Sequence, residues 1–330
     1  MRILVTGGAG YIGSHTVREL ISGGHRVFVY DNLSKGHRSA VPKELLIQGD
    51  TGDAEKLSHV FQSHKIEAVV HFAAYSLVGE SALKPSLYYN NNVANTLELL
   101  DCMLENGINK VVFSSTAAVY GEPEEVPITE NCKKEPTNVY GISKLMVEKI
   151  LESYDRAYGL KYISLRYFNA AGAEASGEIG EHHEPESHLI PIVLQVALGQ
   201  RANLQVFGND YNTPDGTCIR DYVHVTDLAN AHVLALQALN HGSASNAYNL
   251  GNGKGFSVRQ VVEAAQAVTG KVIPTVEVDR RVGDPAILVA SSDKIQKELG
   301  WQPRFASLTD IIASAWKWHS CHQLGYNDAE

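Results

Sequence analysis

The residues best suited to chemistry are Tyr140 and Lys144, together with a run of hydroxyl side chains at Ser114, Ser115 and Thr116. Residues four positions apart on a helix share one face, and an ammonium beside a phenol lowers the pKa of the phenol. A phenol tuned in this way can act as a general base. Because Y-x-x-x-K is a loose pattern, an unlinked surface tyrosine and lysine is the alternative. The segments that precede the pattern decide between the two.

A glycine-rich turn stands near the start of the chain. Gly7, Gly10 and Gly13 follow a short apolar run typical of a strand, and an amphipathic helical pattern comes after them. Gly7 can adopt dihedral angles that other residues avoid, Gly10 lets phosphates approach, and Gly13 allows the helix to pack closely on the strand. The N–H groups of a helix N-terminus favour an anion. We therefore expect a dinucleotide site rather than a turn that binds nothing.

An acidic residue follows at the end of the next predicted strand, 26–31. A carboxylate at Asp31 can accept hydrogen bonds from the adenosine ribose hydroxyls and would repel a 2′-phosphate, which favours NAD over NADP. The alternative role for Asp31 is to cap a turn.

Further apolar runs separated by helical stretches predict a parallel sheet covered on both faces, a Rossmann-type doubly wound α/β fold. Ligands of such sheets bind at the carboxyl ends of the strands. His71, inside one of the runs, is expected to be a hydrogen-bonded core histidine. The predicted strands are 45–50, 68–74, 110–115 and 161–172, and the predicted helices near the hydroxyl run are 87–104 and 139–158.

The composition of the chain changes after residue 172. The segment 174–187 is rich in Gly, His and Glu. A metal is one interpretation of the histidines and glutamates in and just after it, His182, His183, His188, Glu181, Glu184 and Glu186. Their spacing fits no compact site, so we expect a solvated loop and no metal. Residues 1–170 are expected to form the NAD-binding domain, to which the chain returns at about 220–251. A smaller mixed α/β substrate domain is expected within 171–330. Its predicted elements are helices at 189–198, 256–268 and 308–318 and strands at 204–208 and 275–278.

Composition limits the class of protein. The chain has 330 residues, 44% of them hydrophobic, and a formal net charge of −9. This charge argues against a general nucleic-acid or membrane-surface binder. The four cysteines have no metal or redox spacing, which indicates reduced thiols and a cytoplasmic protein. No apolar run reaches the length of a membrane span, and the N-terminus carries no signal-peptide pattern.

Together these motifs resemble the extended short-chain dehydrogenase/reductase family, over nearly the whole chain, and within it the enzymes that epimerise nucleotide sugars. The glycine turn and the Y-x-x-x-K pattern are shared across the superfamily, whereas the block from Phe207 to His224 is more specific. The segments that carry the resemblance are 6–15, 31–32, 79–81, 113–121, 140–144, 165–169, 207–224 and 281–284.

The resemblance implies an NAD-dependent isomerase that interconverts UDP-galactose and UDP-glucose in galactose metabolism. In it, Tyr140 takes the proton from the sugar O4, Lys144 binds the nicotinamide ribose, and Thr116 hydrogen-bonds O4. The implied cofactor-binding residues are Gly7, Gly10, Tyr11, Ile12, Gly13, Asp31, Asn32, Asp50, Thr51, Phe72, Ala73, Ala74, Asn91, Ser114, Tyr140, Lys144 and Tyr167. The implied UDP-hexose-binding residues are Thr116, Asn169, His188, Leu189, Gln205, Phe207, Arg220, Arg281, Asp284 and Leu288. Relatives commonly form homodimers through the helices at 87–104 and 139–158.

The chain departs from the family pattern at three positions. Ser76 replaces a lysine that reaches the cofactor phosphates, and His188 replaces an asparagine, so its charge can vary with pH. Leu288 stands where some relatives have a tyrosine that crowds the sugar C2 side. The extra room leads us to expect some activity on UDP-N-acetylgalactosamine and its gluco epimer, UDP-N-acetylglucosamine.

Two other functions compete with this one. A sugar-nucleotide dehydratase of the same superfamily has an acid pair after the threonine, where this chain has Ala117 and Ala118. Neither alanine can move a proton, which disfavours dehydration. A non-catalytic NAD-sensing regulator could dispense with the base, yet Tyr140, Lys144 and Thr116 are all present.

Overall fold

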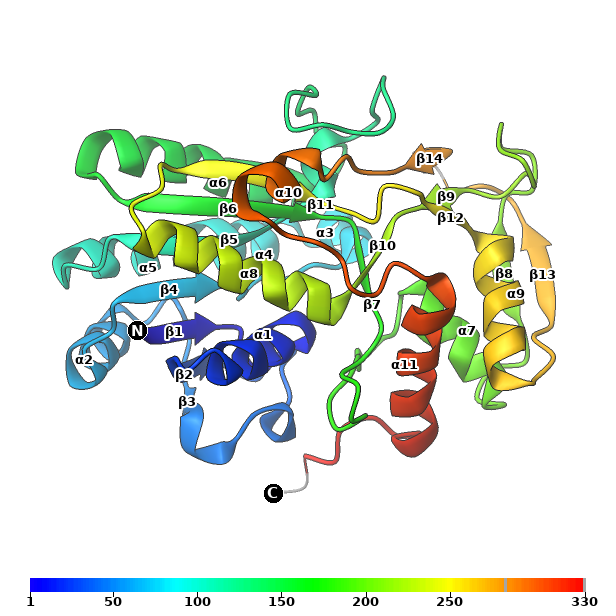
Figure 1. The fold of residues 1–330 in the computed structure, drawn as a ribbon, viewed down its shortest axis with the longest axis horizontal. Coiled ribbons are helices and arrows are strands. Elements are labelled where there is room, and N and C mark those ends of the chain that lie inside the picture. Colours follow the sequence, from blue (N-terminus) through cyan, green and yellow to red (C-terminus); the bar gives the residue numbers. More distant parts are fainter. Residues whose placement is uncertain (282–283, 329–330) are drawn as a thin grey trace.

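The computed structural model of the chain describes residues 1–281 and 284–328. At its centre lies a parallel sheet of seven strands in the order β11-β6-β5-β4-β1-β2-β3, seen in Figure 1. The predicted doubly wound α/β fold is confirmed. The strands are β1 (Arg2–Thr6), β2 (Arg26–Asp31), β3 (Leu46–Gln48), β4 (Ala68–His71), β5 (Lys110–Thr116), β6 (Lys161–Tyr167) and β11 (Asn246–Leu250).

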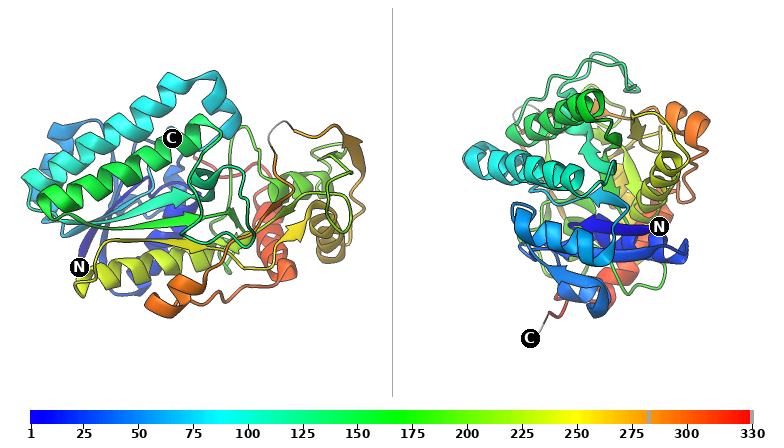
Figure 2. Two further views of the ribbon diagram at one scale, coloured as in Figure 1. Left: turned by 90° about the horizontal axis from the view of Figure 1, so that it is seen from above. Right: turned by 90° about the vertical axis from the view of Figure 1, so that its left-hand side faces the viewer.

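Helices cover both faces of this sheet, as the two views of Figure 2 show. Alternate side chains of β1 point to opposite faces, so Ile3 and Val5 join one core cluster and Leu4 joins the other. The helices α1 (Tyr11–Ser22), α8 (Val225–Asn240) and α10 (Asp293–Leu299) contribute to the first cluster. The helices α2 (Ala54–His64), α5 (Asn95–Glu105) and α6 (Val139–Tyr158) contribute to the second.

The strand order reverses between β1 and β4, which are direct neighbours. In doubly wound sheets the crevice at this point receives the ligand. The glycine turn follows β1 and the segment 72–76 follows β4, so both are positioned there by the sheet itself.

A second core lies beyond the carboxyl ends of the strands and is seen at the right of Figure 1. Three helices pack together here, α7 (Leu189–Ala197), α9 (Val258–Thr269) and α11 (Leu308–Cys321). Ser257 opens α9 with a capping box to Gln260. The strands of this region are β7 (Asn169–Ala171) with β10 (Tyr222–His224), β8 (Leu204–Phe207) with β13 (Thr275–Val278), and β12 (Phe256–Ser257), β9 (Ile219–Arg220) and β14 (Ile287–Leu288).

Several element boundaries differ from those predicted. The run 161–172 is two strands, because the chain leaves the main sheet after Tyr167 and β7 pairs with β10 instead. The run 87–104 is also interrupted, since α4 (Pro85–Tyr88) passes through a π-helical turn, Tyr89–Ala94, into α5. The helix α3 (Val78–Leu83) and α10 were not predicted.

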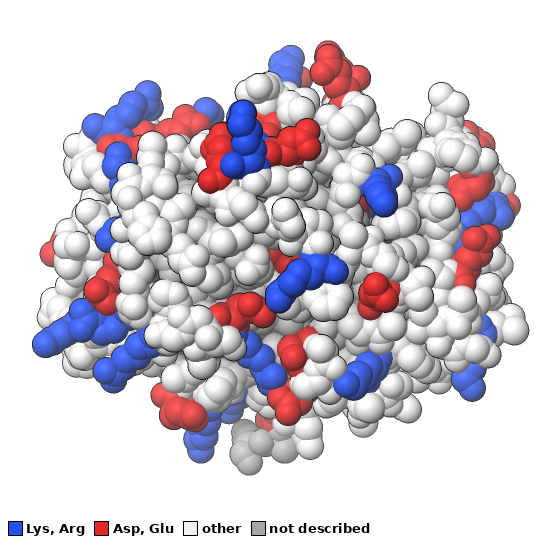
Figure 3. Space-filling model, in the orientation of Figure 1, with Lys and Arg blue, Asp and Glu red and all other residues white. Residues whose placement is uncertain are grey.

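Charged side chains are interspersed over the face shown in Figure 3, with no large region of one sign in that view. Among the described residues, no helix combines the length and the apolar character needed to cross a membrane.

Candidate active site

A single large cavity of about 1010 Å³ runs from the glycine turn to the second core. It joins residues that lie far apart in sequence, among them Gly10, Tyr140 and Arg220. Every predicted cofactor- and substrate-binding residue lines it except Asp50. Of the motif 281–284, Arg281 and Asp284 belong to the lining, while Val282 and Gly283 lie outside the described residues.

The glycines of the turn have three different surroundings. Gly7 has φ +68°, and a Cβ there would lie 2.5 Å from the Ala73 backbone nitrogen. At Gly13 a Cβ would lie 2.3 Å from the Gly7 carbonyl oxygen. At Gly10, however, the nearest atom would be 3.3 Å away, and Gly10 lines the cavity. Gly7 and Gly13 thus shape the turn, and Gly10 leaves space for a phosphate to approach the backbone.

Two carboxylates, Asp31 and Asp50, lie near the glycine turn, and Asp31 bonds it directly. Asp31 is buried and accepts hydrogen bonds from the backbone N–H groups of Ala9, at 3.0 Å, and Leu33, at 2.8 Å. Burial raises the pKa of Asp31 despite these bonds. Asp50 lies behind the lining and accepts hydrogen bonds from the Asn32 and Asn95 amides, at 2.7 and 2.9 Å. Its direct role is therefore to position Asn32.

The proton-transfer residues come together at the end of β5 and the start of α6. Thr116 ends β5, and Tyr140 and Lys144 lie in the first turns of α6, capped by the Asn138 side chain. Lys144 Nζ donates a 2.8 Å hydrogen bond to the Ser114 carbonyl oxygen and lies 4.8 Å from the centre of the Phe113 ring. Thus the helix and the hydroxyl run meet, as the sequence predicted.

The electrostatics differ from the expected ammonium–phenol pair. Burial raises the pKa of Tyr140, and a hydrogen bond with the Thr116 hydroxyl acts in the opposite direction. Burial also lowers the pKa of Lys144 to about 7. The prediction that Lys144 lowers the pKa of Tyr140 is therefore wrong, because burial has the largest influence on that phenol and raises its pKa. A positively charged group bound beside Tyr140 would favour its phenolate.

A buried ion pair between Glu148 and Arg166 contacts the hydroxyl run at Ser115. Glu148 accepts hydrogen bonds from Arg166, at 2.6 and 2.8 Å, and from the Ser115 hydroxyl, at 2.6 Å. Arg166 also donates to the Tyr120 hydroxyl at 2.9 Å. Side-chain exposure of the two charged partners is only 4% and 3%. This network fixes β5 against α6 and was not predicted from the sequence.

The π-helical turn aims neighbouring asparagines in different directions. Asn92 is buried and binds both the N–H and the carbonyl of Tyr75, at 2.9 and 3.0 Å, and Asn91 lines the cavity. Such π turns often occur at functional sites. The structure thereby places Asn91 at the cavity and gives Asn92 a structural role. The sequence alone could not assign these two roles to the two asparagines.

The other end of the cavity carries arginines. Arg220 forms an ion pair with Asp284 and donates a 2.8 Å hydrogen bond to the Ile219 carbonyl. The Arg281 guanidinium lies 3.9 Å from the centre of the Phe207 ring. Guanidinium groups suit phosphate oxygens and an aromatic face suits a base, so this end can hold a nucleoside diphosphate.

The three departures from the family pattern, Ser76, His188 and Leu288, all lie on the cavity wall. Leu288 packs against a small cluster of Val119, Tyr120 and Ile128. The lining also includes residues that were not predicted, among them Lys35, Tyr75, Phe168, His183, Arg201 and Asn203. Loop positions such as these have no local sequence signal, because only the fold brings them to the cavity.

His71 is a core residue, as predicted. Its ring nitrogens lie 2.7 Å from the Thr6 hydroxyl and 3.0 Å from the Thr96 hydroxyl, and burial lowers its pKa to about 3. A histidine so enclosed stays neutral and holds β4 to its neighbours.

Comparison with known proteins agrees with this geometry. Residues 3–251 match the family described as the NAD dependent epimerase/dehydratase family, and the chain belongs to it. A UDP-glucose 4-epimerase of Halalkalibacterium halodurans is 56% identical, with 99% of this chain and 98% of that protein covered.

Several solved structures are also similar to this chain over nearly its full length. A UDP-glucose 4-epimerase crystal structure, 53% identical, superposes with a TM-score of 0.97 over 99% of this chain and 100% of that one. The Bifidobacterium longum UDP-glucose 4-epimerase, solved with NAD⁺ and UDP, is 39% identical, with a TM-score of 0.92 and coverage of 99% and 100%. The Campylobacter jejuni UDP-Glc/GlcNAc 4-epimerase is 42% identical, with a TM-score of 0.86 and coverage of 97% and 99%.

Proposed function

We propose that this chain is a UDP-glucose 4-epimerase that interconverts UDP-galactose and UDP-glucose with NAD as its resident cofactor. The observation that carries the proposal is one cavity that joins a dinucleotide turn, a Tyr–Lys–Thr set and an arginine-rich end. Full-length similarity to UDP-glucose 4-epimerases at 56% and 53% identity supports the same activity.

The cofactor fits the residues present. The free approach at Gly10 suits a pyrophosphate, and the Asp31 carboxylate suits a ribose without a 2′-phosphate. The remaining proposed cofactor contacts are Gly7, Tyr11, Ile12, Gly13, Asn32, Thr51, Phe72, Ala73, Ala74, Asn91, Ser114, Lys144 and Tyr167. NAD, when bound, supplies the acceptor and later the donor of the hydride at the sugar C4.

The chain itself moves the proton and directs the sugar. Tyr140 takes the proton from O4 as C4 is oxidised and returns it as C4 is reduced. Thr116 holds O4 beside the phenol, while Lys144 binds the nicotinamide ribose and stabilises the phenolate when charged. Inversion follows when the 4-ketose presents its opposite face before it is reduced.

The nucleotide end must hold UDP throughout this rotation. Arg220 and Arg281 are assigned to the diphosphate, Asp284 to the uridine ribose and Phe207 to the uracil face. Asn169, His188, Leu189 and Gln205 complete the proposed contacts. Polar anchors are thus concentrated on UDP, and the hexose is left free to turn.

A direct test is to incubate the purified protein with UDP-galactose and no added NAD. We expect UDP-glucose to form, because the cofactor is regenerated in each cycle. A requirement for added NAD, with net accumulation of NADH, would indicate a dehydrogenase instead.

We also infer activity on the N-acetylated sugars. Leu288 leaves room on the sugar C2 side, and the C. jejuni relative is named for both Glc and GlcNAc substrates. Turnover of UDP-N-acetylgalactosamine beside UDP-galactose is expected, and its absence would exclude this part of the proposal.

A homodimer and a cytoplasmic location complete the proposal. Met146 and Tyr158 on α6 and Leu83 on α3 are large apolar side chains with 42%, 64% and 83% exposure, which suits a helix-mediated contact between two copies. All four cysteines are free thiols, which suits a reducing compartment. Sedimentation at several protein concentrations tests the dimer.

A further inference from the structure

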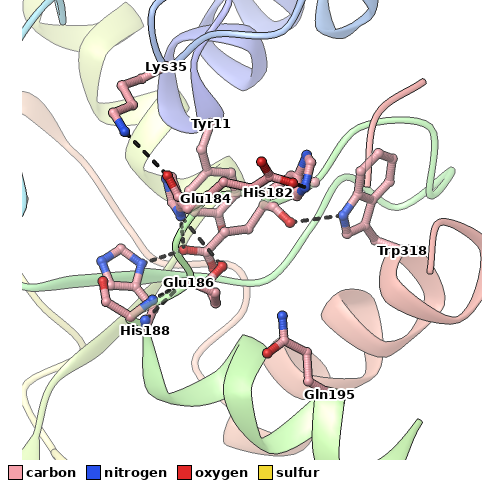
Figure 4. A network of polar contacts seen from close by, with 12 residues as sticks. Tyr11, Lys35, His182, Glu184, Glu186, His188, Gln195 and Trp318 are labelled. Atoms are coloured by element: carbon pink, nitrogen blue, oxygen red, sulfur yellow. Dashed lines mark hydrogen bonds and ion pairs between the residues drawn. The ribbon is translucent and has the colours of Figure 1, made fainter. Parts of the chain in front are cut away.

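The segment 181–188, at the end of the Gly-, His- and Glu-rich loop, contains a compact cluster that its spacing did not indicate. Single ligand atoms of Glu181, His183, Glu186 and His188 all lie within 4.8 Å of one another. Figure 4 shows Glu186 and His188 close together, below Tyr11. The expectation of a solvated loop without a compact site is therefore wrong.

Residues from the C-terminal segment explain the compactness. Trp318 Nε1 donates a 3.0 Å hydrogen bond to the Glu181 carbonyl oxygen, and the Tyr326 hydroxyl bonds the Gly180 N–H and carbonyl at 3.0 and 3.1 Å. A Cβ at Gly180 would lie 2.2 Å from the Trp318 ring. The loop is thus folded against α11 and the tail, which local spacing cannot indicate.

The two carboxylates of the cluster are almost fully enclosed. Side-chain exposure is 3% for Glu181 and 4% for Glu186. Glu186 Oε1 accepts the backbone N–H groups of Ser187 and His188, at 2.8 and 2.9 Å, so its Oε2 remains directed at His183. Two buried carboxylates require compensating positive charge.

The distances around His183 match metal coordination better than hydrogen bonding. Its Nδ1 lies 3.3 Å from Glu181 Oε1 and 3.6 Å from Glu186 Oε2. Charge-assisted hydrogen bonds are shorter, about 2.7–2.9 Å. Ligands of a tetrahedral ion with bonds of about 2.0–2.1 Å stand about 3.3–3.4 Å apart. His188 Nδ1 contacts Glu181 directly, and an ion would replace the proton they share.

We propose that Glu181, His183, Glu186 and His188 form a binding site for a divalent cation of the zinc class. Two imidazoles and two carboxylates suit zinc and give a neutral site. Binding at Nδ1 leaves the second ring nitrogen of His188, Nε2, to carry a hydrogen, and His188 lines the cavity. Resting on the proposed function, that donor would contact the substrate diphosphate, so the ion acts as a positioning group.

The test measures zinc in the full-length protein as purified with its cofactor. Elemental analysis after gel filtration is expected to give about one zinc per chain, and cobalt substitution is expected to give the visible absorption of a tetrahedral site. Glu186→Gln and His183→Asn should each lower retained zinc at least tenfold. Glu184→Gln is the matched control, because its side chain is 87% exposed and lies outside the cluster.

The alternative occupant is a pair of protons, one on each imidazole, which would also balance the two carboxylates. Zinc below a tenth of an equivalent after incubation with excess zinc, or equal retention in Glu186→Gln and Glu184→Gln, would establish that state and overturn the metal site. Circular dichroism and NAD content verify that each variant folds. Because the readout is metal content, failure of the epimerase assay with zinc retained would overturn the proposed function and leave the metal site standing.

Discussion

At one end of the cavity, Tyr140 and Lys144 are carried by a long helix and Thr116 by a central strand. The buried Glu148 of that helix, paired with Arg166 of the next strand, bonds Ser115 and secures the two elements. At the other end, Arg220 and Asp284 are carried by a two-residue strand and a loop. At the first end, long secondary-structure elements fix the positions of the side chains. At the second end, the site depends mainly on charged side chains. An epimerase needs this division, since proton and hydride transfer require position, while the nucleotide must be held as its sugar rotates.

The largest effect is expected at the rigid end, from Tyr140→Phe. Loss of the base should lower kcat by about 10²–10⁴-fold, because no other proton acceptor is assigned at O4. UDP binding should be unchanged, since the nucleotide end is untouched. Steady-state kinetics and calorimetric UDP titration measure the two quantities. Retained turnover would show that Tyr140 is not the base. Lost UDP binding would show that the two ends of the cavity do not act independently.

At the charged end, Arg220→Ala should raise KM and leave kcat within a few-fold of wild type. Hydrogen bonds to charged groups contribute about 1.5–3 kcal/mol, equivalent to about a 10–150-fold rise in KM. Arg259→Ala is the control, because that arginine pairs with Glu277 on an exposed surface, with 46% exposure of each side chain. A fall in kcat with KM unchanged would assign Arg220 to the chemical step instead.

A third substitution, Leu288→Tyr, lies between the two ends and should shift the substrate preference away from the N-acetylated sugar. The larger side chain is expected to lower kcat/KM for UDP-N-acetylgalactosamine about tenfold, within the about 1–3 kcal/mol typical of steric discrimination in a pocket. Activity on UDP-galactose should change little, and Leu288→Met should leave both substrates nearly unaffected. Equal losses on both substrates would show that position 288 does not select at C2.

The smallest effect concerns stability and pH. Burial lowers the pKa of Lys144 to about 7, so above pH 7 the folded protein has released a proton that the unfolded chain keeps until its ordinary pKa of 10.5. Stability should therefore rise with pH over that window, through this group, by at most about 1.4 kcal/mol per pH unit.

Lys144→Met should remove that increment, measured as the difference between the wild-type and variant urea unfolding free energies at pH 7 and 8. The Lys144→Met protein must first show unchanged circular dichroism. A parallel pH dependence in the two proteins would mean that Lys144 titrates normally.

Elements with strong local signals were predictable from sequence. The strand 26–31 and the helix 139–158 have the predicted bounds, because hydrophobic period and flanking residues agree there. Nearly all predicted site residues line one cavity, since motifs at strand ends are brought together by a parallel sheet.

What could not be predicted depends on distant parts of the chain. The strand break after Tyr167 follows from pairing with β10, and the compact cluster at 181–188 follows from packing against Trp318. The pKa of Tyr140 is a matter of burial, which no residue spacing gives. Tertiary context, rather than weak local patterns, accounts for these differences.

The central claim is that hydride leaves and returns within one site. UDP-galactose carrying deuterium at C4 tests it most directly, in the presence of excess added NAD. The account predicts UDP-glucose with the deuterium still at C4 and none in the added cofactor. Loss of deuterium to solvent or to the added NAD would contradict a resident cofactor that ends each cycle as it began.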